Sequence, residues 1–156
     1  MTVTVAILGY VEVRRDGVRL VLPSGKSTHV LVRLALEAGR AVSPDRLIDE
    51  LWPADDLTDR NTLQSKISQL RRALGDASLI TSSRAGYLLD VDPATVDALR
   101  VVGMAEQVSA LRGTGDLAAV EATCSAALAL FRGELLADSG DPWLDPHRAR
   151  LRLRSR

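Results

Sequence analysis

The first quarter of the chain alternates apolar and polar residues, as strands of a sheet with one buried face do. Residues 3–7 follow this alternation, and it recurs over residues 11–13 and 18–22. Asp16-Gly17, between the last two runs, is a strong hairpin signal. We therefore predict an antiparallel meander of three or four strands at the start of the chain.

Helical spacing replaces this alternation from about residue 27 onward. It predicts three successive helices, over about residues 27–38, 44–52 and 60–74. Gly39 and Gly75 stand where glycines end helices, and Ser43-Pro44 is an N-cap followed by a first-turn proline.

A short β-hairpin is predicted after the third helix, with strands over residues 79–81 and 87–91 and a turn over 82–86. The order helix, turn, helix, hairpin is that of a winged helix, in which the second of the two helices enters the DNA major groove. This interpretation makes residues 60–74 the reading helix. It places Arg84 at the tip of the wing, within reach of a minor groove or a phosphate.

The composition changes at Asp92-Pro93, and every later signal is helical. Helices are predicted over about residues 96–112 and 117–131, joined by a short glycine-containing turn, which gives a TPR-like helical hairpin. We therefore predict an α+β fold, with a winged-helix domain over residues 1–93 and an all-α helical segment over residues 94–156.

The predicted helix over residues 60–74 carries the most informative pattern. At about 100° per residue, its four apolar side chains fall within about 60° of each other. These are Leu63, Ile67, Leu70 and Leu74. The opposite side holds Asn61, Gln64, Ser65, Ser68, Gln69 and Arg72, with Arg60 and Arg71 on one shoulder and Lys66 on the other.

This polar face suits a DNA major groove. Amides, hydroxyls and guanidinium groups match the donors and acceptors on base edges, and cations on the shoulders match the bounding phosphates. No acidic residue occurs between Arg60 and Gly75. The alternative is a solvated polar face without a ligand, a common use of such patterns.

Charge and composition argue against several classes of function. Lys+Arg and Asp+Glu number 20 each, so only the local charge favours a nucleic acid. Two separated histidines and one cysteine give no zinc-ligand spacing and no nucleophile–base pair, so we expect no metal, no cofactor and no enzymatic activity. No apolar run approaches about 20 residues and no signal-peptide pattern begins the chain, which favours a cytoplasmic protein without a membrane partner.

Several segments closely resemble the antibiotic regulatory proteins of streptomycetes, activators with an OmpR/PhoB-type winged helix. The resemblance is strongest in Arg60-Asn61-Thr62-Leu63-Gln64 and in Leu70-Arg71-Arg72-Ala73-Leu74-Gly75-Asp76. Residues 42–52 and 86–91 are similar to the family's second helix and the far strand of its wing. Residues 96–100, 126–134 and 142–143 are similar to the start of its bacterial transcriptional activation domain.

The resemblance implies a transcriptional activator of secondary-metabolite (antibiotic) genes. Such activators bind direct repeats in double-stranded DNA near promoters as side-by-side dimers, so a homodimer on DNA and RNA polymerase are the implied partners. The groove-facing residues are then Asn61, Gln64, Ser65, Ser68, Gln69 and Arg72, and the phosphate contacts are Arg60, Lys66 and Arg71. The loop from Pro53 to Asp59 corresponds to the family's polymerase-facing loop.

Departures from the family pattern concern the target sequence. Gln69 stands where the family usually has Arg or His, and Ser83 stands where its wing arginine lies, one residue before Arg84. Gln in place of Arg removes a charge-assisted contact and favours adenine over guanine. The helical part is also less than half as long as the family's. An alternative function is therefore a protein-interaction module, or a shortened regulator with weak DNA binding that acts through a partner regulator.

Overall fold

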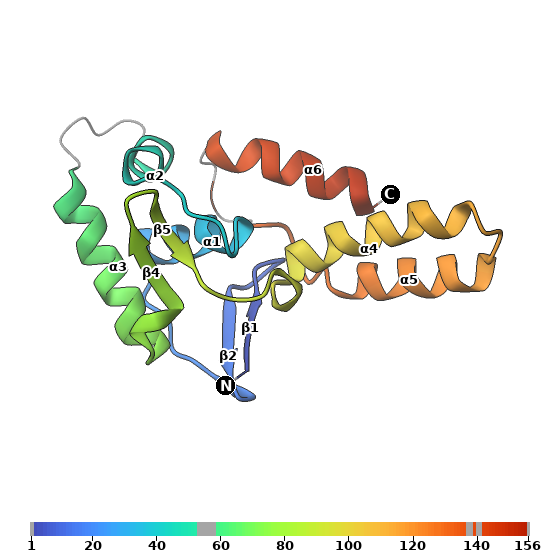
Figure 1. Ribbon diagram of the computed structural model, residues 1–156, viewed down its shortest axis with the longest axis horizontal. Helices are drawn as coiled ribbons and strands as arrows, with labels where there is room; N and C mark the ends of the chain where they lie inside the picture. The colour runs from blue at the N-terminus through green and yellow to red at the C-terminus, as the bar shows by residue number, and fades with distance from the viewer. Residues whose placement is uncertain (1, 53–58, 137–138, 140–141, 156) are drawn as a thin grey trace.

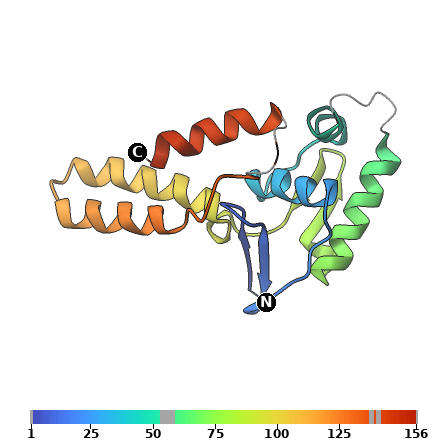
Figure 2. The ribbon, with the colours of Figure 1, turned by 180° about the vertical axis from the view of Figure 1, so that it is seen from behind.

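The computed structural model describes residues 2–52, 59–136, 139 and 142–155. It has the predicted α+β architecture: an N-terminal sheet, three helices and a second hairpin, followed by a helical part (Figure 1). The third helix and a long helical hairpin lie at opposite ends of the molecule in both ribbon views (Figures 1 and 2).

The N-terminal sheet is an antiparallel meander of three strands, β1 (Val3–Ala6), β2 (Glu12–Arg15) and β3 (Val18–Arg19). Asp16 and Gly17 form the predicted turn, with φ of 53° and 83°. The third strand is shorter than the predicted run over 18–22, because both of its residues are exposed and the chain leaves the sheet to reach the first helix.

The three helices lie where the spacing predicts them: α1 (Lys26–Leu36), α2 (Pro44–Leu51) and α3 (Arg60–Leu74). The Ser43 hydroxyl accepts a hydrogen bond from the Arg46 N–H at 3.2 Å and so caps α2. The Asp59 carboxylate caps α3 by accepting from the Thr62 N–H at 3.0 Å. Gly75 ends α3 in the left-handed conformation, at a φ of 73°.

The wing consists of β4 (Ile80–Ser83) and β5 (Gly86–Leu89), preceded by the short 3-10 helix η1 (Ala77–Leu79). Its turn is tighter than the predicted 82–86, because the two strands continue pairing as far as Ser83 opposite Gly86. Val42 adds a bridge on the other side of β5 by exchanging two backbone hydrogen bonds with Tyr87, at 2.8 and 3.0 Å. A Cβ on Gly86 would lie 2.0 Å from the Val42 carbonyl oxygen, so only glycine permits this approach.

The helical part follows the short turn η2 (Pro93–Thr95). It consists of α4 (Asp97–Arg112), α5 (Leu117–Ala129), the turn η3 (Pro142–Leu144) and α6 (Asp145–Ser155). The predicted helices 96–112 and 117–131 are confirmed to within two residues. Helix α6 packs against α4, and η3 packs against α2 of the N-terminal part (Figure 1).

Asp97 joins the two parts of the chain. Its buried carboxylate accepts hydrogen bonds from the backbone N–H groups of Ile7 and Leu8, at 2.9 and 3.0 Å, and from Ala98 at 2.7 Å. Burial raises the pKa of Asp97, and the three N–H donors only partly offset that effect. Val96 also bridges to Val5, so the helical part begins as an extension of the N-terminal sheet.

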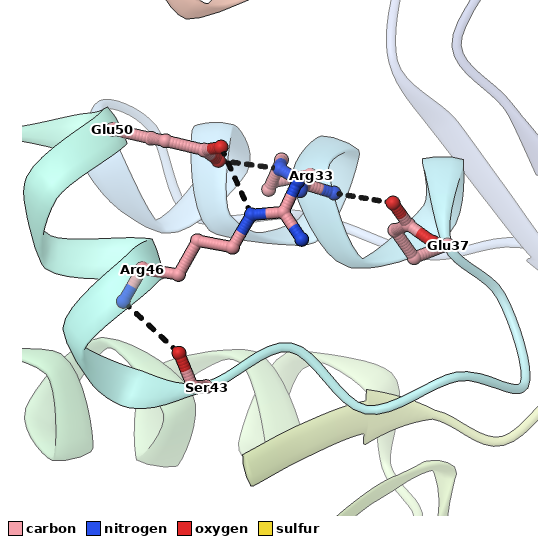
Figure 3. A network of polar contacts seen from close by, with 5 residues as sticks. All are labelled: Arg33, Glu37, Ser43, Arg46 and Glu50. Carbon is pink, nitrogen blue, oxygen red and sulfur yellow. Dashed lines mark hydrogen bonds and ion pairs between the residues drawn. The ribbon is translucent and has the colours of Figure 1, made fainter. Parts of the chain in front are cut away.

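An ion-pair network around the buried Arg33 ties α1 to α2 (Figure 3). The Arg33 side chain is fully buried and donates from Nε to Glu50 at 2.6 Å, while its Nη1 lies 3.5 Å from Glu37. Arg46 contacts the other oxygen of Glu50 at 3.3 Å. Burial alone would raise the pKa of Glu50, but the hydrogen bonds and charges of Arg33 and Arg46 outweigh it and lower that pKa.

Replacing Asp97 with alanine should lower the free energy of unfolding by about 2–4 kcal/mol, because the buried N–H groups of Ile7 and Leu8 lose their acceptor. Urea unfolding measures the change. Asp116→Ala is the matched control, since Asp116 caps the exposed start of α5 and should cost about 1 kcal/mol. Equal losses in the two variants would contradict the structural role of Asp97.

Glu50→Gln should destabilise the protein at pH 7 by roughly 2–3 kcal/mol, because it leaves the buried Arg33 charge without its main partner. The folded pKa of Glu50 lies below its ordinary value of 4.5. Its contribution is therefore present above pH 4.5 and is lost as the pH falls through the folded pKa. The gap between wild type and variant should then narrow in acid, and urea unfolding of both proteins at several pH values measures it.

Candidate nucleic-acid interface

Helix α3 presents one polar face to solvent because its apolar stripe is fixed in the core. Leu63, Ile67, Leu70 and Leu74 are each at most 1% exposed. The helix packs against α1 and α2 on its inner side and lies along one flank of the molecule beside the wing (Figures 1 and 2). The four predicted core positions of this helix are confirmed.

The outward face carries the residues predicted to enter a groove. The exposed ones are Asn61, Gln64, Ser65, Ser68, Gln69 and Arg72. Lys66 and Arg71 are half-buried at the two shoulders, and Arg60 is exposed at the start of the helix. Arg84 is exposed in the turn between β4 and β5. The structure therefore brings α3 and the wing side by side on one flank of the molecule (Figure 1).

Three of these side chains already have partners within the protein. Arg60 Nη2 lies 3.3 Å from Asp45 of α2 in an exposed ion pair. Arg71 donates from Nε to the Ile80 carbonyl at 2.9 Å and so ties α3 to β4. Gln69 Oε1 accepts a hydrogen bond from the Ser27 hydroxyl of α1 at 2.7 Å.

Three cations are less constrained. Across the part of the chain that the structure describes, Lys66, Arg72 and Arg84 take part in no hydrogen bond or ion pair with another side chain. Helix α3 itself contains no acidic residue. Its solvent face therefore combines cations with neutral hydrogen-bonding groups, the chemistry that phosphates and base edges require.

None of these three contacts was predicted from the sequence. Ser27 is fully buried and precedes Val30, Leu31 and Leu34 at helical spacing, so a polar residue on the apolar face of α1 was the available signal. The Asp45 contact had no such signal, because an exposed acid at the start of a helix is ordinary.

The surroundings of the interface hold a shallow hollow of about 330 Å³ beside Gln69 and Arg72, lined on its other side by residues 21–23. Among the residues described here, no group of three or more His, Cys, Asp or Glu could hold a metal ion. None of the described helices is long and apolar enough to cross a membrane. Residues 53–58 of the predicted polymerase-facing loop lie outside the described residues.

Comparison with known proteins agrees with this geometry. Residues 19–89 match the family model described as the C-terminal domain of transcriptional regulatory proteins. Residues 96–155 match the bacterial transcriptional activator domain. The structure of EmbR from Mycobacterium tuberculosis, solved in complex with a low affinity phosphopeptide, is similar with a TM-score of 0.88 and 26% identity, over 98% of this chain and 42% of that one.

Two curated relatives share both parts of the chain. The transcriptional regulator RedD of Streptomyces coelicolor is 34% identical over 89% of this chain and 42% of its own length. The regulatory protein DnrI of Streptomyces peucetius is 35% identical over 85% of this chain and 53% of its own length. The chain thus spans about half the length of these relatives. It belongs to the family of antibiotic regulatory proteins, in which an OmpR/PhoB-type DNA-binding domain precedes a bacterial transcriptional activator domain.

Proposed function

We propose that this chain is a sequence-specific DNA-binding activator of transcription that controls secondary-metabolite (antibiotic) genes. The observation that carries the proposal is the exposed face of α3. Its fixed apolar stripe leaves an acid-free set of amide, hydroxyl and guanidinium groups outward, beside a wing that carries Arg84. The regulatory relatives of the chain support the same role.

We assign each side chain of the interface to a base edge or to a phosphate, according to its place on α3 or the wing and the partners it already has. Asn61, Gln64, Ser65 and Ser68 lie on the outermost strip of α3 and would meet base edges, since a helix about 10–12 Å wide fits a major groove of about 12 Å. Arg72, near the end of that strip, is the candidate for a bidentate contact with guanine. Lys66 and Arg84 would contact phosphates.

Arg60 and Arg71 have more limited roles in this proposal. Arg71 uses Nε to hold the wing and would contact a phosphate only through its remaining guanidinium nitrogens. Arg60 must exchange its ion pair with Asp45 for a phosphate. The exchange at Arg60 reduces the net gain from that contact, because an existing ion pair is lost.

The assembly on DNA is also part of the proposal. Binding to direct repeats as a side-by-side homodimer, and recruitment of RNA polymerase through the loop over residues 53–59, follow the family. The α4–α5 hairpin projects from the end of the molecule opposite α3 (Figure 1). A protein partner there would not compete with DNA for the same surface.

Fluorescence anisotropy with a direct-repeat duplex from the neighbourhood of the gene tests the proposal, beside a scrambled duplex and a salt series. We expect preference for the native duplex and a log–log salt slope of about −2 to −4, for two to four phosphate contacts per protomer. Weak binding that ignores sequence would contradict the proposal. It would favour the alternative of an interaction module that acts through a partner regulator.

Arg72→Ala should weaken binding to the native duplex by about 1–3 kcal/mol and relax the sequence preference at one position, because a base contact is lost. Titrations of native and scrambled duplexes measure the two effects. Arg84→Ala serves as the comparison, since loss of a phosphate contact should weaken both duplexes alike. Equal losses on both duplexes for Arg72→Ala would reassign Arg72 to a phosphate.

Asp45→Asn should strengthen binding to any duplex about two- to fivefold, because Arg60 no longer exchanges an ion pair worth up to about 1 kcal/mol for a phosphate. The salt slope should become steeper by up to about 0.9. Asp49→Asn removes the same charge from the same helix without touching Arg60, and should have a smaller effect. An equal gain in both variants would show that the Arg60 pair is not involved.

A further inference from the structure

We propose that Ser27 is a positioning residue that turns the Gln69 amide so that Nε2 donates to DNA, which disfavours the paired donor and acceptor contact that glutamine makes with adenine. The inference rests on the proposed function and specifies the chemistry at one position of that interface. The juxtaposition that carries it is a fully buried hydroxyl on α1 bonded to an exposed amide on α3.

The direction of this hydrogen bond decides what the amide presents. Ser27 Oγ donates to Gln69 Oε1 at 2.7 Å. The carbonyl end of the carboxamide is therefore directed toward the protein, and the planar amide turns Nε2 away from Ser27. Gln69 is exposed and has no other side-chain partner in the described part of the chain, so the two N–H groups of Nε2 remain to donate.

The position of Ser27 makes this orientation stable. Ser27 lies in the first turn of α1, is 0% exposed, and has Gln69 as the partner of its hydroxyl. If Gln69 turned away, or its amide flipped end for end, the buried O–H of Ser27 would lose the acceptor that it has here, which is costly without water to replace it. Because α1 packs against α3, the two ends of the hydrogen bond are held by rigid helices.

A glutamine held in this orientation differs from a free glutamine in what it offers to a base edge. A free glutamine pairs with adenine by accepting from N6 and donating to N7. Oε1 keeps a second lone pair, but with Oε1 directed at Ser27 the amide does not present Oε1 and Nε2 together to one base edge, so the N6 and N7 groups of adenine are not both paired. The acceptors that fit best are the adjacent O6 and N7 of guanine, or a phosphate oxygen, because adenine N7 and thymine O4 each lie beside a group that cannot accept a second N–H. The Ser27 contact thus reverses the adenine preference that Gln69 alone predicts.

Gln64 provides an internal comparison. It is an exposed glutamine on the same helix, and no hydrogen bond to its side chain occurs among the described residues. Its amide can therefore rotate and present either end to DNA. The two glutamines have the same side chain, but a buried serine holds the amide of Gln69 and no such contact holds that of Gln64 among the described residues.

Selection from a pool of random-sequence duplexes, followed by anisotropy on the selected site, tests the inference. The variants are Ser27→Ala, Gln69→Glu, Gln69→Ala and Gln64→Ala, with Ser125→Ala on α5 as a control for folding. In Gln69→Glu, one carboxylate oxygen still accepts from Ser27 and the other presents an acceptor in place of the donor. That variant should bind the wild-type site at least about tenfold more weakly.

The Ser27→Ala variant separates the two acceptors. If Gln69 contacts guanine, the Ser27→Ala variant should accept adenine at that base pair without a large loss of affinity. If Gln69 contacts a phosphate, the variant should bind all duplexes more weakly, and by the same factor. In either case the effect of Ser27→Ala should disappear in a Gln69→Ala background and remain in a Gln64→Ala background, a coupling that a purely structural role of Ser27 would not produce.

The outcomes that overturn the inference are distinct from failure of the proposed function. A wild-type protein that enriches no sequence would remove the proposed function and this inference with it. A wild-type protein that enriches a site but reads adenine at the position altered by Gln69→Ala would overturn the inference alone. So would Ser27→Ala and Gln69→Glu variants whose affinity and selected sequence both match wild type.

Discussion

Burial of one apolar stripe on α3 is the constraint on which the interface depends. Each fully buried Leu or Ile side chain contributes about 1.5–3 kcal/mol, so the four residues at or below 1% exposure contribute roughly 6–12 kcal/mol. That is comparable to the whole stability of a typical domain. Rotation of α3 about its axis would expose these side chains and lose much of that free energy. The outward set of polar side chains is therefore fixed by the core.

The hydrophobic pattern was sufficient to predict the helices and the outward face of α3, because the 3.6-residue period and the capping residues leave little choice. Asp16-Gly17 and Ser43-Pro44 marked their turn and helix start correctly. The third strand was predicted too long, because alternation over 18–22 does not show where an edge strand loses its partner. The wing turn was predicted too wide for a related reason. The backbones of β4 and β5 continue to pair as far as Ser83 opposite Gly86, and residue types alone do not show where that pairing ends.

The interface residues were predictable as a set but not in their individual roles. The helical wheel gives the direction of Gln69, Arg60 and Arg71, but not the groups that they meet. Those groups are Ser27, Asp45 and the Ile80 carbonyl, and they come from other elements of the chain. Contacts between elements depend on how helices pack, which a single sequence does not specify residue by residue. They change what each α3 side chain can offer to DNA.

The two parts of the chain form one continuous hydrophobic core. Buried apolar residues of both parts belong to one cluster, Leu135 bridges to Leu8, and η3 packs against α2. Asp97 also accepts hydrogen bonds from the N–H groups of Ile7 and Leu8. The activator domain is thereby attached to the sheet and helices that support α3.

The central claim is that the polar face of α3 lies against DNA in the bound protein. Its most direct test is maleimide labelling of single cysteines at Ser65→Cys, Ser68→Cys and Ser125→Cys in a Cys124→Ala background, with and without a selected duplex. The account predicts that DNA protects the two α3 positions strongly and leaves the α5 position unchanged. Labelling of the α3 positions at the same rate in the bound complex would contradict it.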